Sequence, residues 1–323
     1  MDKILFMLYS ALLKLQPYFK IYLFIMSNRF MKIFSENKLK TPPIWIMRQA
    51  GRYLPEYREI RSSLNGFLDL CYNPELACEI TMQPIKRFDL DAAIIFSDIL
   101  VIPHSLGINV EFKEGIGPIV EKVTDPIRIS QLRINPQNDK LQKIYQAVSM
   151  VRNTLDSNKP LIGFSGGVWT NICYILADNN LKDKFEPTQI TALKNPELID
   201  SLIVILQEQT ALYLIEKIKH GANIIKIFES WSGLLAQEEF ERFVIKPTKY
   251  IISKIKAEFP DIPIIGFPKG AGFLYENYLQ NIPVDVLACD QFVPLHKIQE
   301  WQGKIVVQGN MNPLTLFSSK EKI

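Results

Sequence analysis

Arginine side chains are concentrated in residues 47–58, where the sequence MRQAGRYLPEYR also holds two tyrosines and a glycine. Arg48 and Arg52 stand on either side of Gly51, so a tight turn or a first helical turn could direct both side chains into one site. Because the guanidinium group is a planar fork, it can bind a carboxylate through two parallel hydrogen bonds. The stretch therefore predicts a site for a ligand that carries several carboxylates.

Asp98 is the second residue whose type and position indicate chemistry, because it ends a run of apolar residues. A carboxylate among apolar side chains is costly unless hydrogen-bond donors compensate for its charge. As a group that only accepts hydrogen bonds, it can meet several N–H donors that converge on one point. Its apolar neighbours in the sequence are Ile94, Ile95, Phe96, Ile99, Leu100 and Val101.

Each of these two features can also be explained by a purely structural role. Taken without the rest of the sequence, each favours that structural explanation. Arg48 and Arg52 could pair with Glu56 and Glu59 on a solvated helix, since surface ion pairs are common. Asp98 could cap a following turn or bind a backbone amide at the end of a strand.

The elements that must position these residues follow from the alternation of short β-branched runs with longer helical patterns from residue 44 onward. This alternation predicts an α/β fold of βα units around a parallel sheet. A polar residue stands at or just after the C-terminal end of every predicted strand, which is where the active sites of (β/α)₈ barrels are built. The predicted strands are 44–48, 92–97, 161–164, 222–228, 262–267, 284–289 and 304–309, and the polar residues are Arg48, Asp98, Ser165, Ser230, Lys269, Asp290 and Asn310.

Two helices and one hairpin have clear boundaries in the sequence. A helix is predicted to begin at Pro74 after the capping residue Asn73, and a longer one to run over residues 196–219 until Gly221 stops it. Two β-rich runs flank a glycine turn within residues 101–123, which predicts a hairpin inserted after the second strand.

Composition sets further bounds on the function. A chain of 323 residues with 47% hydrophobic residues can fold as one large domain, and 37 basic against 34 acidic residues give no patch for nucleic acid. The four cysteines form no CxxC pair, and with only three histidines no zinc-ligand spacing is present. We therefore expect free thiols in a reducing cytoplasm and neither a metal nor another cofactor.

Residues 1–26 differ from the rest because they are apolar and carry almost only lysine charges. Lys14, Pro17 and Lys20 interrupt the apolar runs, which are too short for a stable membrane span. We interpret the segment as a non-native extension, with translation starting near Met26 or Met31, and keep an interfacial anchor as the alternative.

Beyond residue 40 nearly the whole chain resembles the uroporphyrinogen decarboxylase family. The first of the shared motifs is specific to that family, and the others are informative in their order. This resemblance implies a homodimeric TIM-type (β/α)₈ barrel that removes carbon dioxide from the four acetate side chains of uroporphyrinogen III and yields coproporphyrinogen III. The motifs are MRQAGRYLPEYR, FSDIL, GFSGGVWTNICYIL, IIKIFESWSG, GFPKGAG and VVQGNMNP.

The resemblance also implies roles for individual residues. Asp98 would accept hydrogen bonds from the four pyrrole N–H groups of the domed macrocycle, and Arg48 is a candidate proton donor. Tyr174 and Ser230 match family residues near the ring and a substrate carboxylate, with core packing and a plain strand end as their alternatives. The implied substrate-binding set is Arg48, Gln49, Ala50, Gly51, Arg52, Asp98, Tyr174 and Ser230, of which Asp98 and Arg48 are the catalytic candidates.

Decarboxylation of a pyrrole acetate leaves a carbanion, which most enzymes stabilise with a cofactor that accepts electrons. Lys269 could serve as a Schiff-base residue, but its glycine neighbours are more typical of an anion-binding loop. A pyrrole protonated on carbon could accept the electrons instead, and the carboxylate of Asp98 would stabilise that cation.

The chain departs from the family after residues 310–313, because only ten residues follow where the family has a further strand bearing a substrate-contacting histidine. We therefore expect residues 27–323 to form a single, C-terminally truncated barrel that lacks the last strand and helix. An inactive remnant of such an enzyme is the alternative. A cobalamin-linked methyltransferase of the same fold is a distant third, since it needs a zinc held by His and Cys, and Cys289 has no such partner.

Overall fold

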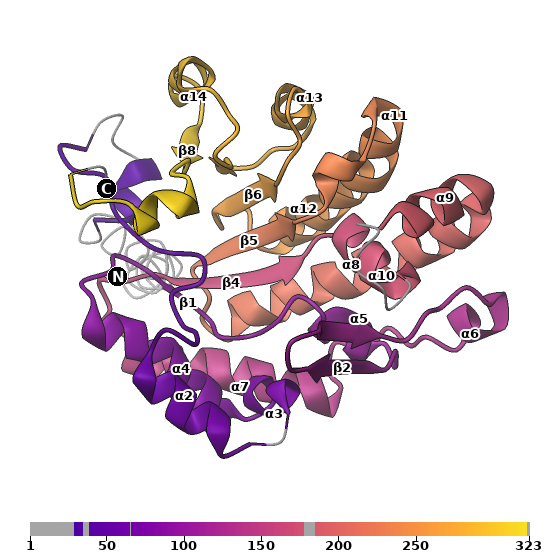
Figure 1. The fold of residues 1–323 in the computed structure, drawn as a ribbon, viewed down its shortest axis with the longest axis horizontal. Helices are drawn as coiled ribbons and strands as arrows, with labels where there is room; N and C mark the ends of the chain where they lie inside the picture. Colours follow the sequence, from indigo (N-terminus) through magenta and orange to yellow (C-terminus); the bar gives the residue numbers. More distant parts are fainter. Residues whose placement is uncertain (1–28, 35–38, 65, 178–184, 322–323) are drawn as a thin grey trace, which may run out of the picture.

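The computed structural model describes residues 29–34, 39–64, 66–177 and 185–321. Within this part, six parallel strands form one curled sheet in the order β1-β4-β5-β6-β7-β8 (Figure 1). The predictions for residues 1–26 lie outside the described residues. The strands are β1 (Ala93–Ile94), β4 (Leu161–Gly166), β5 (Ile224–Glu229), β6 (Ile264–Pro268), β7 (Val286–Ala288) and β8 (Val306–Gln308).

Helices cover the outer face of the sheet, so strand residues are buried on both faces. Every residue of β4 is buried, which explains why the parallel strands appear in the sequence as nearly continuous apolar runs. The α-helices are α2 (Pro55–Ser62), α3 (Phe67–Cys71), α4 (Pro74–Arg87), α5 (Val101–Ser105), α6 (Pro126–Ser130), α7 (Asp139–Thr154), α8 (Val168–Leu176), α9 (Glu186–Lys194), α10 (Pro196–Lys219), α11 (Gln237–Phe240), α12 (Lys246–Glu258), α13 (Leu274–Asn281) and α14 (Leu295–Gln302). Shorter helical turns are η1 (Met31–Phe34), η3 (Ser232–Leu234), η4 (Glu241–Ile245) and η5 (Pro313–Phe317).

The two helices with clear sequence boundaries form as expected. Asn73 caps α4 because its side chain accepts a hydrogen bond from the Leu76 amide at 3.0 Å. Gly221 follows α10 with a φ of 114°, a left-handed conformation that favours glycine. Among the described residues, α10 is long and apolar enough to cross a membrane, but its apolar side chains pack against α8, α12 and β4 as in a core helix.

The predicted strand 44–48 is wrong, because these residues form no strand in the structure. They lie beside β1 and are held there by one backbone bond, from the Asp91 amide to the Ile44 carbonyl at 2.9 Å, and by side chains in place of a ladder. The Asp91 carboxylate accepts a hydrogen bond from the Ile44 amide at 2.6 Å. The side-chain oxygen of Gln49 accepts one from the Ile94 amide at 3.2 Å, in the amide orientation that suits its neighbours. The donors that a ladder would use are thus already occupied.

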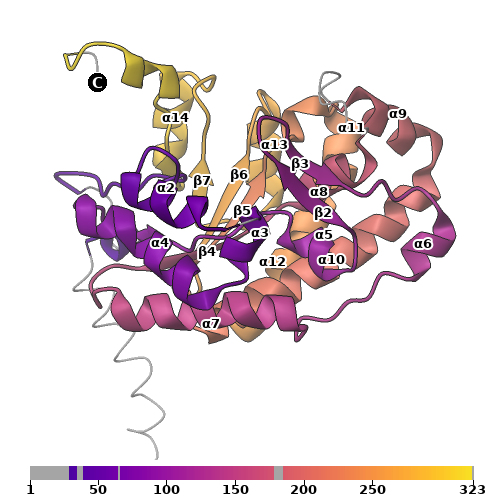
Figure 2. The ribbon, with the colours of Figure 1, turned by 60° about the horizontal axis from the view of Figure 1, so that its bottom comes forward.

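The predicted hairpin forms, but it is shorter than residues 101–123 because α5 takes up the first of them. Its strands β2 (Val110–Lys113) and β3 (Gly117–Val120) pair antiparallel, with Val110 opposite Val120. Gly115 and Gly117 both have positive φ in the turn. The hairpin packs against α3 and α8 (Figure 2), at the same end of the sheet as the loops that follow β1 and β4.

Candidate functional site

Asp98 follows β1 in a half-buried position at the C-terminal end of the sheet. Its Oδ1 accepts a hydrogen bond from the Leu100 amide at 2.8 Å. Burial raises the pKa of Asp98 to about 6, while the Leu100 amide and the positive charge of Arg48 act in the opposite direction. The hydrogen bond expected if Asp98 caps the following turn is therefore present. It uses only one of the two carboxylate oxygens.

Arg48 and Arg52 are both exposed, and neither side chain makes an ion pair with a residue that the structure describes. Glu56 pairs instead with Arg87, at 2.9 Å. The third arginine of the motif, Arg58, donates to the backbone carbonyl of Arg52 at 2.8 Å and so stabilises the loop. Two guanidinium groups thus remain available for an anion.

The residues between these arginines differ in what they offer a ligand. Gln49 is buried, and its side chain joins Ile46 and Ile94, so it supports the loop and does not face the site. Gly51 is different, since a Cβ placed there would meet no described atom within 4 Å. Its carbonyl closes the turn by accepting from the Leu54 amide at 3.0 Å. Open space therefore lies in front of the backbone at Gly51.

Tyr174 lies on α8 among aromatic rings, with ring-centre distances of 5.4 Å to Phe185 and 6.4 Å to Trp231. Burial raises its pKa, and both Asp98 and Arg48 are close enough to influence it electrostatically. The Trp231 indole N–H lies near the Tyr174 hydroxyl and, as a hydrogen-bond donor, acts to lower that pKa. Asp98, Arg48 and Tyr174 therefore lie near one another, and the Trp231 indole beside Tyr174 is a further polar group that the sequence did not reveal.

The polar residues at strand ends divide into two groups. Ser230 is half-buried, and Lys269 is exposed at the edge of its loop. Others serve the fold: Asp290 accepts from the Gly270 amide at 2.6 Å and from the Tyr275 hydroxyl at 2.9 Å. Asn310 donates to a backbone carbonyl, and Ser165 is fully buried. That one mouth collects all seven polar residues stays a prediction, and Asp290 and Asn310 are bonded within the fold.

Glu229 is a buried carboxylate that the sequence analysis missed. It ends β5 and accepts from the amides of Trp169 and Thr170 at 3.2 and 3.0 Å, and from the Thr170 hydroxyl at 2.7 Å. It thereby caps α8, whose own capping residue Gly167 has no side chain. Burial raises the pKa of Glu229 to about 7 against the effect of these donors. This contact fixes the helix that carries Tyr174.

The residues after Glu229 also connect neighbouring parts of the site. The Trp231 carbonyl accepts from the indole of Trp169 at 3.2 Å. Ser232 donates to the Lys269 carbonyl in the loop after β6 at 2.8 Å. Residues 229–232, which include Ser230, thus connect the loops that follow β4, β5 and β6.

His104, on α5 shortly after Asp98, lies between Tyr72 and Lys140. Its Nδ1 is 2.9 Å from the Tyr72 hydroxyl, and its Nε2 is 2.9 Å from Lys140 Nζ. Because an ammonium group only donates, Nε2 must accept and Nδ1 must carry the proton. Burial and the Lys140 charge lower the pKa of His104 to about 4.

This arrangement predicts an acid-sensitive contribution to stability. The unfolded chain binds a proton at His104 below its ordinary pKa of 6.5, whereas the folded protein does so only near 4. Stability should therefore be lost as the pH falls from 6.5 towards 4. His104→Gln should flatten the melting-temperature profile in this window, and parallel profiles for the two proteins would contradict the assignment.

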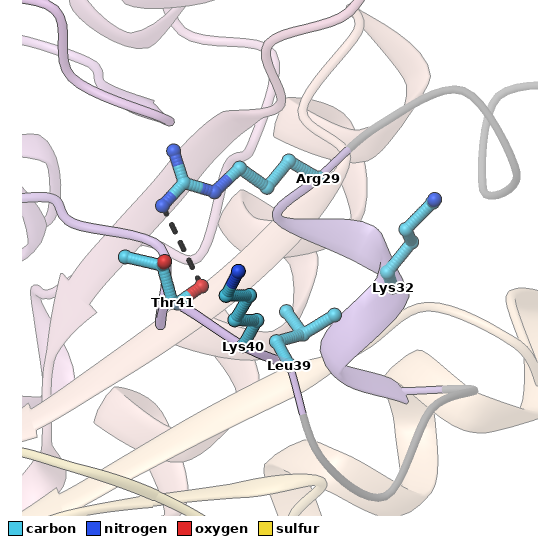
Figure 3. A pocket seen from close by; sticks show the side chains of 5 residues that line it. All are labelled: Arg29, Lys32, Leu39, Lys40 and Thr41. Carbon is cyan, nitrogen blue, oxygen red and sulfur yellow. Dashed lines mark hydrogen bonds between the residues drawn. The ribbon is translucent and has the colours of Figure 1, made fainter.

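A basic pocket of about 610 Å³ lies apart from these residues, near the start of the described chain (Figure 3). Its Arg29 already donates to the carbonyls of Thr41 and Pro42 and lies 3.5 Å from an oxygen of Asp91. None of the predicted site residues lines it. The lining residues are Arg29, Lys32, Leu39, Lys40 and Thr41.

The family model described as uroporphyrinogen decarboxylase (URO-D) matches residues 26–323. The chain belongs to the uroporphyrinogen decarboxylase family. Uroporphyrinogen decarboxylase from Rickettsia massiliae (strain Mtu5) is 49% identical over 289 residues, which are 90% of this chain and 82% of that protein. The one from Rickettsia rickettsii (strain Sheila Smith) is 51% identical over 281 residues, which are 87% of this chain and 81% of that protein.

A solved methyltransferase from Methanosarcina mazei has the same fold, with a TM-score of 0.68 over 88% of this chain and 83% of its own. At 14% identity, this likeness concerns the fold alone. The expected α/β barrel-type architecture and the expected carboxy-lyase family of porphyrin biosynthesis are both confirmed. The sheet is a curled half-barrel of six strands in the described residues, one fewer than the sequence predicted.

Proposed function

We propose that this chain is a uroporphyrinogen decarboxylase that converts uroporphyrinogen III into coproporphyrinogen III without a cofactor. At each of four acetate groups, R–CH₂–COO⁻ and one proton become R–CH₃ and carbon dioxide. The family match over residues 26–323 is the observation that carries the proposal. The grouping of Arg48, Asp98 and Tyr174 at one end of the sheet supports it.

The chemistry of the substrate explains the residues we assign to it. Uroporphyrinogen carries eight carboxylates, so exposed guanidinium groups at Arg48 and Arg52 can bind its acidic side chains, and the open backbone at Gly51 admits the ring. Ala50 and the backbone of Gln49 belong to the same loop. Ser230 would donate to a further substrate carboxylate.

Asp98 would accept the pyrrole N–H groups through the oxygen that the Leu100 amide leaves unused. Protonation of a ring carbon would make the pyrrole a cation, and the Asp98 carboxylate would stabilise that cation. The cation would then take up the electron pair that carbon dioxide leaves behind. Arg48 would supply a proton to the methylene carbon that carbon dioxide leaves, and the ring carbon would then release the proton it had gained, so that each decarboxylation consumes one proton in total. Tyr174 would border the ring.

The test is release of carbon dioxide from uroporphyrinogen III, with the oxidised products separated by chromatography. We expect tetracarboxylated porphyrin to appear at the expense of the octacarboxylated form. A protein that is folded by circular dichroism but releases no carbon dioxide would overturn the proposal and would leave the inactive remnant as the answer.

Arg52→Lys should raise KM with little change in kcat. A point charge replaces a planar fork, so one of two parallel hydrogen bonds to a carboxylate is lost, which we expect to raise KM about tenfold. Arg58→Lys is the matched control, because Arg58 contacts backbone carbonyls of its own loop. An unchanged KM in Arg52→Lys would remove Arg52 from the binding site.

We also propose a soluble, cytoplasmic homodimer whose residues 27–323 act as one domain. Large apolar side chains are exposed in the loops that follow β6, β7 and β8, and an apolar surface of this kind favours association with a second copy. Four buried, unpaired cysteines agree with a reducing compartment. Light scattering would test the oligomeric state. The exposed apolar residues are Phe273, Phe292, Leu295, Leu314 and Phe317.

A further inference from the structure

Lys226 is a fully buried lysine in the middle of β5, and the proposed function does not use it. Its Nζ donates to the side-chain oxygen of Gln308 on β8 at 2.9 Å. Three aromatic rings surround the ammonium group, with centres 5.1 Å away at Trp45, 5.0 Å at Phe228 and 5.1 Å at Phe267. Within the described residues, no carboxylate lies within ion-pair distance of it.

A charge in this place is costly, so the aromatic rings and the amide must compensate for it. Burial lowers the pKa of Lys226 well below its ordinary value, and the thiol of Cys289 is the titratable neighbour that opposes the shift. A cation over aromatic faces gains stability that grows when water is excluded. The contacts of Lys226 with Trp45 and Gln308 partly compensate for this burial, and each links the interior to a different edge.

The position of Lys226 in the sheet makes these two contacts unusual. β5 is central in the strand order, Gln308 belongs to the last strand β8, and Trp45 belongs to the segment beside the first strand β1. Figure 1 shows β1 and β8 at the two edges of the curled sheet. One ammonium group thus reaches across the interior to both edges.

Trp45 stands three residues before Arg48, in the segment 44–48 that no strand ladder holds. Asp91 holds the start of that segment at Ile44, and the Gln49 side chain donates to the Ile46 carbonyl at 3.2 Å, directly after Trp45. Trp45 and Met47 also pack against the core, and the Lys226 ammonium group lies over the Trp45 ring, three residues before Arg48. The location of the Arg48 guanidinium therefore depends on this contact.

We propose that Lys226 is a positioning residue: by holding Trp45 inside the curled sheet and tying it to Gln308, it sets where Arg48 meets an acidic side chain of the substrate. This inference rests on the proposed role of Arg48 in substrate binding. Lys226 itself touches no substrate.

The chain offers a matched control in Lys217, on α10. It is also fully buried, it donates to the Phe164 carbonyl at 2.8 Å, and its ammonium lies over the rings of Phe164 and Tyr213. Lys217, however, lies between α10 and β4 on the helix side of the sheet, away from Trp45. It reproduces the burial and the contacts of Lys226 without the link to Arg48.

The experiment is a double-mutant cycle measured in the uroporphyrinogen decarboxylation assay. Lys226→Met keeps an unbranched side chain that is one atom shorter, and should raise KM about fivefold through the lost cation–π contact. In an Arg48→Ala background the same change should have no further effect on KM, because Lys226 acts on KM through the Arg48 side chain, which that variant lacks. Lys226→Arg should restore KM most of the way, and Lys217→Met should lower the melting temperature without moving KM.

Several outcomes would show whether Lys226 positions Arg48. Equal effects of Lys226→Met with and without Arg48 would overturn the inference, and so would a KM rise in Lys217→Met as large as that in Lys226→Met. If Lys226→Met does not fold, Trp45→Leu takes its place in the cycle and must show the same coupling to Arg48. Absence of activity in the unmodified protein would instead refute the proposed function, so the two failures are distinguishable.

Discussion

Asp98→Asn should lower kcat by roughly 100-fold to 1,000-fold, each factor of ten being about 1.4 kcal/mol of barrier. The amide nitrogen of asparagine presents donors where the pyrrole N–H groups need an acceptor, and the variant has no negative charge for the cationic intermediate. Folding should be almost unaffected, because the remaining amide oxygen can still accept from Leu100. Single-turnover assays and thermal melts measure the two effects.

Asp156→Asn is the matched control for this change. Asp156 accepts from the backbone amide two residues later, at 3.1 Å, just as Asp98 does at 2.8 Å, but it lies on the exposed surface. The control should keep full activity. Similar small losses in both variants would favour the alternative in which Asp98 only caps a turn.

The same assignment gives a pH dependence for the free enzyme. Since burial raises the pKa of Asp98 to about 6, the carboxylate is ionised above that pH and becomes protonated below it. The kcat/KM of the unmodified protein should therefore fall on the acidic side of pH 6. This limb should be absent from Asp98→Asn, and its persistence there would assign it to another group.

Glu229→Ala should destabilise the protein by about 3 kcal/mol or more, since burying an unpaired donor costs roughly 1–3 kcal/mol. The change would leave two amides and one hydroxyl of the first turn of α8 without an acceptor. It should also lower kcat/KM, because α8 carries Tyr174. Denaturant unfolding and steady-state kinetics measure the two losses.

Glu276→Ala provides the comparison for Glu229. Glu276 also accepts a hydrogen bond, from Lys297, but their ion pair lies at the surface, where its removal should change the melting temperature little. An equally mild result for Glu229→Ala would show that water replaces the carboxylate at the start of α8.

The sequence predicts the parallel strands and long helices well because local patterns determine them. β4 and β5 are buried on both faces and consist mostly of apolar residues, and Asn73 and Gly221 mark helix ends through their own side chain or backbone. The segment 44–48 has the same local pattern but forms no strand, since side chains distant in sequence take the donors that a ladder would need.

Prediction of the site was limited for the same reason. The sequence reveals that Asp98 and Arg48 are unusual, but the role of Glu229 depends on a helix that begins about sixty residues earlier. One signal was present: Gly167 precedes α8 and cannot cap it, so another residue had to accept from its first turn. The acidic residue at the end of the neighbouring strand β5, Glu229, is that acceptor.

The stretch 229–232 contacts both the start of α8 and the loop after β6, through Glu229, Trp231 and Ser232, so its length matters more than any one of its side chains. Insertion of a single residue there would displace Trp231 and Ser232 from both of their partners at once. We therefore infer that natural variants of this enzyme exchange amino acids along the stretch while its number of residues stays fixed.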